Sequence, residues 1–101
     1  MGKRVLLVTT DLVFRSKLAG VIAAAGGAVT RDEAQCDLAV LELAAPPGAG
    51  GRVRELVRRG IPVLAFGAHV QPDALRAARE AGATAVPNSQ VEARLRELLN
   101  A

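Results

Sequence analysis

The feature that most constrains the fold is a series of short, continuous apolar runs separated by segments of helical character. Residues 5–8 form one such run, residues 38–41 a second and residues 61–66 a third. Continuous apolar runs of this length are typical of strands buried on both faces, as in a parallel sheet. The segments between them carry apolar residues at helical spacing. The sequence therefore predicts an α/β domain.

The expected elements are bounded by glycine and proline, which mark turns and helix ends. The predicted strands are 3–9, 28–31, 38–43, 61–66 and 83–86. The predicted helices are 12–25, 52–59, 72–81 and 91–99. Right-handed crossovers between parallel strands give an open, doubly wound sheet with helices on both faces.

One crossover is too short for this pattern. Only residues 32–37 separate the second strand from the third, whereas a parallel connection normally needs about a dozen residues or more. The second helix is therefore expected to be missing or vestigial. Omitting it leaves part of one sheet face uncovered, and exposed apolar surface favours association. Homodimerisation, or docking of another protein on that face, is the corollary.

Length and composition limit the class of protein. At 101 residues the chain is expected to form a single domain, 1–101, and its two Phe and absent Trp and Tyr imply an aliphatic core. Thirteen basic and ten acidic residues are mixed along the chain, which argues against a nucleic-acid binder. The apolar runs are too short for a membrane span. With Cys36 as the single cysteine, an internal disulfide is excluded and a cytoplasmic location is expected.

The order of elements and several spaced residues resemble the response-regulator receiver domain, the CheY-like and flavodoxin-like module of two-component signalling. In that family the phosphoacceptor aspartate of the third strand is followed four residues on by proline and eight on by glycine. Glu42, Pro46 and Gly50 reproduce this spacing. Residues 81–83, Ala-Gly-Ala, are similar to the end of the family's fourth helix. The resemblance covers the chain apart from the second helix and implies a five-stranded parallel sheet.

The positions that serve phosphorylation in the family carry other residues here. Where two acidic residues would hold Mg²⁺ after the first strand, the chain has Thr9 and Thr10, with Asp11 one place late. Hydroxyls carry no charge to hold Mg²⁺, which prefers carboxylate oxygens. The phosphoacceptor position is Glu42, whose longer side chain moves the carboxylate. Gly67 stands where the family has its switch hydroxyl.

The lysine position of the family is occupied by Asn88, or by Ser89 if the turn is one residue longer. The resemblance therefore implies a pseudo-receiver with no catalytic residue, bound metal or cofactor. Two interpretations of individual residues stay open. Glu42 either mimics a phosphorylated aspartate or is a partly solvated carboxylate at a strand end. Asp11 is a helix N-cap or a metal ligand, and the N-cap is favoured.

Our first hypothesis is a non-enzymatic regulatory module that works without phosphorylation and binds another protein, which the sequence does not identify. The alternative is a sensor of a small molecule or anion, because open α/β sheets bind ligands at the carboxyl ends of their strands. A third hypothesis keeps Glu42 as an atypical phosphoacceptor. The residues of the sensor site would be Thr9, Thr10, Glu42, Gly67, His69 and Asn88, with Ser89 as a further contact for a ligand or partner.

Overall fold

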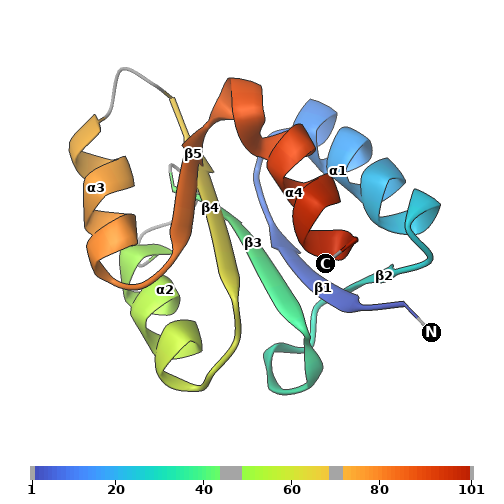
Figure 1. Cartoon of the computed structure of the whole chain (residues 1–101), viewed down its shortest axis with the longest axis horizontal. Coiled ribbons are helices and arrows are strands. Elements are labelled where there is room, and N and C mark those ends of the chain that lie inside the picture. The colour runs from blue at the N-terminus through green and yellow to red at the C-terminus, as the bar shows by residue number, and fades with distance from the viewer. Residues whose placement is uncertain (1, 44–48, 69–71, 101) are drawn as a thin grey trace.

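The fold is one five-stranded sheet between two layers of helices (Figure 1). The structure is a computed structural model that describes residues 2–43, 49–68 and 72–100. The strands are β1 (Arg4–Val8), β2 (Ala28–Thr30), β3 (Leu38–Glu42), β4 (Val63–Gly67) and β5 (Thr84–Pro87). The helices are α1 (Leu12–Ala24), α2 (Ala49–Arg58), α3 (Pro72–Glu80) and α4 (Val91–Leu99), with two single 3-10 turns, η1 (Glu33–Gln35) and η2 (Asn88–Gln90).

The sheet is parallel throughout and has the strand order β2-β1-β3-β4-β5. The chain therefore starts near the middle of the sheet, winds to one edge, crosses back and winds to the other. All strands run in the same direction, so their carboxyl ends lie together at one end of the sheet. At this end Val8 pairs with Leu41, and Gly67 pairs with Pro87. The predicted doubly wound α/β architecture is confirmed.

The core has two layers because successive side chains of a strand point to opposite faces of the sheet. Helices α1 and α4 cover one face and helices α2 and α3 cover the other (Figure 1). The first layer includes Val5, Leu7, Leu18, Ile22, Val40, Leu64, Phe66, Val91 and Leu95. The second includes Leu6, Ala39, Leu41, Val53, Leu56, Ala65, Leu75 and Ala78. Burial on both faces explains why the strand sequences are continuously apolar.

The second helix of the alternating pattern is reduced to η1, so the expectation of a vestigial helix is confirmed. Asp32 caps this single turn by accepting a hydrogen bond from the backbone N–H of Ala34 at 2.9 Å. Strand β2 is also short, and its pairing with β1 ends at Leu6 and Thr30. Within β1, Val5, Leu6 and Leu7 are nevertheless buried, and Val8 at its end is half-buried.

The prediction that the helix after β3 begins at Arg52 is wrong, because α2 already begins at Ala49. The two glycines that argued against a helix at 50–51 lie in its first turn. The N–H groups of a first turn have no intrahelical partner to lose, and the helix is held by the burial of Val53 and Leu56 against the sheet. In the described part of the chain, the helices are all too short or too polar to cross a membrane.

Candidate functional site

The predicted site residues gather at the carboxyl ends of the strands. Thr9 and Thr10 follow β1, Glu42 ends β3 and Gly67 ends β4. The parallel register places these strand ends side by side. The topology also reverses between β1 and β3, and this is where open α/β sheets usually bind ligands.

The centre of this site is the carboxylate of Glu42. Its Oε1 atom accepts a hydrogen bond from the Thr9 hydroxyl at 2.8 Å, from the Thr10 backbone N–H at 3.0 Å and from the Thr10 hydroxyl at 3.3 Å. Thr9 is 8% exposed, so its contact is shielded from water, whereas Thr10 is exposed. The side chains that replace the expected metal-binding acids thus hold the carboxylate themselves.

Asp11 caps the helix that follows with its carboxylate. Its Oδ1 accepts hydrogen bonds from the N–H groups of Val13 at 2.9 Å and Phe14 at 3.1 Å, which makes it the N-cap of α1. Its own N–H donates to the Thr9 hydroxyl at 3.1 Å. The favoured interpretation of Asp11 as an N-cap is confirmed. Within the described ranges, no group of three or more His, Cys, Asp or Glu side chains is arranged to hold a metal ion.

Gly67 is buried at the end of β4, where it pairs with Pro87. A Cβ atom placed on it would lie 3.6 Å from the Leu43 side chain and 3.9 Å from that of Leu75. These are ordinary van der Waals distances, so the space at this position accepts a small side chain. His69, the remaining residue of the sensor hypothesis, lies outside the described residues.

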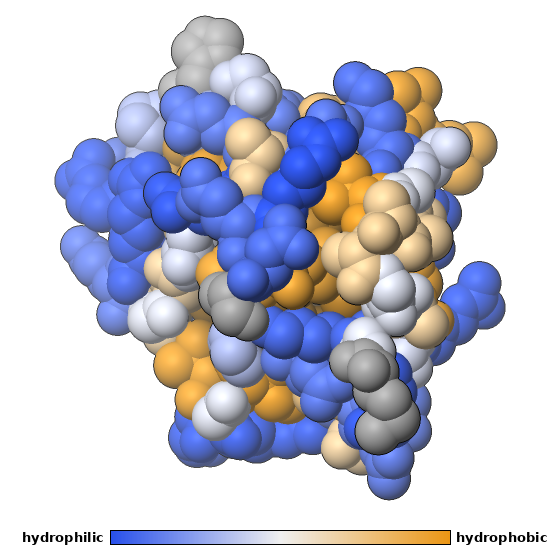
Figure 2. Space-filling model, turned by 45° about the vertical axis from the view of Figure 1, so that its right-hand side comes forward, coloured by the Kyte–Doolittle hydropathy of each residue, from blue (hydrophilic) through white to orange (hydrophobic). Residues whose placement is uncertain are grey.

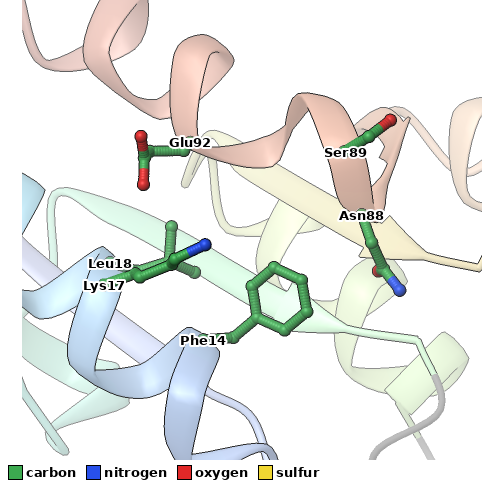
Figure 3. A pocket seen from close by; sticks show the side chains of 6 residues that line it. All are labelled: Phe14, Lys17, Leu18, Asn88, Ser89 and Glu92. Carbon is green, nitrogen blue, oxygen red and sulfur yellow. The ribbon is translucent and has the colours of Figure 1, made fainter.

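Asn88 and Ser89 line a separate cavity of about 330 Å³ between α1 and α4 (Figure 3). The Oδ1 atom of Asn88 is buried there and has no hydrogen-bond partner among the described residues. No hydrogen bond joins Asn88 to the Glu42 cluster in the described part of the chain. The position that resembles the family's lysine therefore contributes to a different place on the molecule.

Four further residues of this cavity were missed as site residues by sequence reasoning: Phe14, Lys17, Leu18 and Glu92. The ammonium group of Lys17 comes from α1 and the carboxylate of Glu92 from α4 (Figure 3). Phe14 packs against Phe66 in the core, with ring centroids 5.4 Å apart. Only the packing of α1 on α4 brings these residues together, so no local motif signals the cavity.

Cys36 is half-buried beside η1, and its thiol donates to the Glu33 carbonyl at 3.6 Å. Burial raises the pKa of the Cys36 thiol above its usual range, although the nearby Arg59 guanidinium opposes this change. A raised pKa lowers the fraction of reactive thiolate at neutral pH. The environment of Cys36 is thus that of a packing residue.

No protein-family model and no curated protein matches the chain in sequence. Solved structures do match. A putative response regulator from Chloroflexus aurantiacus is 22% identical, with all of both chains covered and a TM-score of 0.75. A CheY-like response regulator receiver domain protein from Methanospirillum hungatei is 16% identical over 99% of this chain and 92% of that chain, with a TM-score of 0.77.

A third match is NtrX from Brucella abortus, which is 16% identical over 99% of this chain with a TM-score of 0.75. The chain covers 26% of NtrX, so it spans about a quarter of that protein. At these identities the similarity establishes the fold. The chain has the fold of response-regulator receiver domains, with the second helix reduced to one 3-10 turn.

Proposed function

We propose that this protein is a signalling module of the receiver type that works without phosphorylation and acts by binding another protein. The observation that carries the proposal is the set of hydrogen bonds from Thr9 and Thr10 to Glu42. In the receiver pattern the residues after β1 are acidic and hold Mg²⁺ beside the phosphoacceptor. Here they are donors that engage the carboxylate directly.

The chemistry of phosphoryl transfer supports this proposal. Such a transfer depends on positioning the nucleophile and on neutralising the charge of the phosphoryl oxygens. Thr9 and Thr10 bring no charge that would attract Mg²⁺. The Glu42 oxygen that they hold already accepts three hydrogen bonds. The site is thus built to fix a carboxylate in place, which is a non-catalytic role.

The two remaining positions of the pattern also favour a module that does not switch. Gly67 has no hydroxyl that would move toward a phosphoryl group, and Asn88 has no ammonium group to pair with one. Asn88 lines the cavity between α1 and α4. A signal would therefore pass through binding of a partner rather than through a change at Glu42.

An NMR titration with Mg²⁺ and then beryllofluoride, which imitates a phosphoryl group on a carboxylate, tests the proposal. We expect the amide resonances of residues 9–11, Glu42 and Gly67 to stay unchanged. The triple variant Thr9→Asp/Thr10→Asp/Glu42→Asp restores the acidic residues of the receiver pattern and is the positive control. We expect its amide resonances at these positions to shift on addition of Mg²⁺. Shifts confined to these residues in the unmodified protein would refute phosphorylation independence.

The cavity between α1 and α4 favours a second candidate function, a sensor of a small charged molecule. Lys17 and Glu92 supply opposite charges at its wall, and Phe14 supplies an apolar surface (Figure 3). A thermal-shift screen with nucleotides and phosphorylated metabolites tests this candidate. A true ligand raises the melting temperature of the protein but not that of Lys17→Ala. If no compound stabilises the protein, the sensor hypothesis is rejected.

A further inference from the structure

A groove of about 240 Å³ lies at the carboxyl end of β1, away from the cavity between α1 and α4. Its floor is lined by residues 6–10, of which Val8 is half-buried and Thr10 is exposed, while the other three are buried. Three arginines from separate elements complete its wall: Arg15 of α1, Arg31 after β2 and Arg52 of α2. We call these residues together the arginine groove.

The arginine groove exists because the second crossover is so short. Strand β1 continues to Val8, but its pairing with β2 ends at Leu6 and Thr30. The chain then makes the single turn η1 where a helix would otherwise cover the sheet. The groove thus lies where an element is reduced, and Val8 is the apolar residue of its floor that is only partly buried.

Within the described residues, one of the three arginines of the groove forms a salt bridge. Arg52 forms a salt bridge with Glu33 of η1. In the described part of the chain, Arg15 and Arg31 form no salt bridge with an acidic side chain. Two positive charges therefore border an apolar floor, which is complementary to a surface that is both apolar and acidic.

An exposed leucine extends this surface along α1. The side chain of Leu12 is 79% exposed. Leu12 precedes Arg15 by three residues, so both lie on the same face of α1. On the face drawn in Figure 2, hydrophobic areas are interrupted by hydrophilic side chains.

We propose that the arginine groove is the docking surface of this module and that its occupant is an acidic amphipathic helix of a partner protein. This inference rests on the proposed function. The partner helix takes the place of the reduced second helix, with its apolar face on the floor and its carboxylates toward Arg15 and Arg31. The groove lining holds no aromatic side chain for stacking nucleic-acid bases.

The test is an NMR titration of the whole chain with a synthetic amphipathic peptide that has leucine at positions i, i+3, i+4 and i+7 and glutamate elsewhere. A peptide with lysine in place of every glutamate is the matched control. We expect the glutamate peptide to shift the amides of residues 6–10, 12–15 and 31, and the lysine peptide to leave them unchanged. Binding should weaken with added salt, because the Debye length falls from about 10 Å at 0.1 M to about 3 Å at 1 M.

A matched pair of variants separates the groove from general electrostatic attraction. Arg15→Glu alone should lower the affinity for the glutamate peptide by at least about tenfold, and adding Arg31→Glu should lower it further. Lys17→Glu makes the same change of charge as Arg15→Glu on the same helix, but it faces the other cavity, and it should retain the affinity. An unchanged pattern of amide resonances in each free variant verifies its fold.

Three outcomes would overturn the inference: no binding of the glutamate peptide, shifts mapped to another surface, or equal losses in Arg15→Glu and Lys17→Glu. A dimer that forms in sedimentation and is abolished by Arg15→Glu would also overturn it, because the occupant would then be a second copy of the chain. The beryllofluoride titration is independent of these results. If docking at the arginine groove is refuted, the proposal of phosphorylation independence is unaffected. If phosphorylation independence is refuted, the docking proposal is likewise unaffected.

Discussion

The contact between Thr9 and Glu42 is the residue-scale feature on which the candidate site depends. The two residues are 33 positions apart in sequence, and their hydrogen bond is 2.8 Å long and part-buried. A hydrogen bond to a charged group contributes about 1.5–3 kcal/mol when well formed. The same carboxylate receives a longer bond, 3.3 Å, from the exposed Thr10 hydroxyl. The Thr9 hydroxyl is therefore expected to contribute more to the stability of the fold than the Thr10 hydroxyl.

Thr9→Val should lower the free energy of unfolding by about 1–2 kcal/mol, since the near-isosteric side chain removes a shielded donor from Glu42. Thr10→Val is the matched control, and we expect a loss below about 0.5 kcal/mol because its hydroxyl is exposed and its bond is long. Urea denaturation followed by circular dichroism measures both. Equal losses in the two variants would contradict the assigned role of Thr9.

Gly67→Ala should stabilise the protein by about 0.4–1 kcal/mol, because the added methyl group fits at ordinary contact distance and restricts the unfolded chain. Gly82→Ala is the contrasting variant: Gly82 has φ of +102°, and its added Cβ would lie 2.8 Å from the Val57 side chain. We expect it to destabilise by more than about 1 kcal/mol. Thermal unfolding of both variants gives the comparison, and a destabilised Gly67→Ala would show that the space is not available.

The reactivity of Cys36 should follow its raised pKa. Labelling with iodoacetamide is expected to be slower than for a free cysteine at pH 8 and to rise at a pH above the usual thiol range. Because the folded state holds this proton more tightly than the unfolded state, the associated stability is present below the unfolded pKa and is lost as pH rises through the folded pKa. Arg59→Ala removes the opposing charge and should slow labelling further. Faster labelling in that variant would contradict the assigned effect of Arg59.

At the scale of elements, caps and crossovers determine which polar groups reach the site. Asp11 caps the start of α1. The single turn η1 is attached to α2, since Arg59 donates to the Glu33 carbonyl at 2.7 Å and Arg52 pairs with the Glu33 carboxylate. Glu33 of the reduced crossover thus pairs with Arg52, one of the residues that line the arginine groove.

Asp11→Ala should cost about 1 kcal/mol of stability, because two backbone N–H groups at the start of α1 lose their acceptor. Asp73→Ala is a suitable control. Asp73 lies in the first turn of α3, and its exposed carboxylate pairs with Arg76 one turn further on, so its loss should cost only a few tenths of a kcal/mol. Hydrogen exchange should locate the effect of Asp11→Ala in the first turn of α1. Uniform acceleration along the chain would argue against a capping role.

At the scale of the whole molecule, the two core layers share one sheet and are expected to unfold together. Leu64 lies in the layer of α1 and α4, and Leu41 in the layer of α2 and α3. Both are almost completely buried. Because the strands that carry them are adjacent in the sheet, loss of packing on one face removes support from the other.

Leu64→Ala and Leu41→Ala should each cost about 2–5 kcal/mol, from lost transfer free energy and the cavity left behind. In both variants, far-ultraviolet circular dichroism and methyl NMR signals from the two layers should report one midpoint of unfolding. Separate midpoints for the two layers would show that they are independent cooperative units.

The sequence by itself determined the architecture of this protein. Continuous apolar runs such as 61–66 are set by burial on both sheet faces, and the interval of six residues at 32–37 is too short for a helix whatever the rest of the chain does. The helix 91–99 begins and ends where its spacing predicts. These features are local, because periodicity and chain length act over a few residues.

The tertiary structure alone decided which of the predicted site residues contact one another. The parallel register carries Glu42 to Thr9 and Thr10, whereas Asn88 joins Lys17 and Glu92 in a cavity between two helices. The arginine groove likewise depends on the end of β2 and on the position of η1. Such contacts join residues far apart in the chain, so they follow from strand register and helix packing, which no local pattern contains.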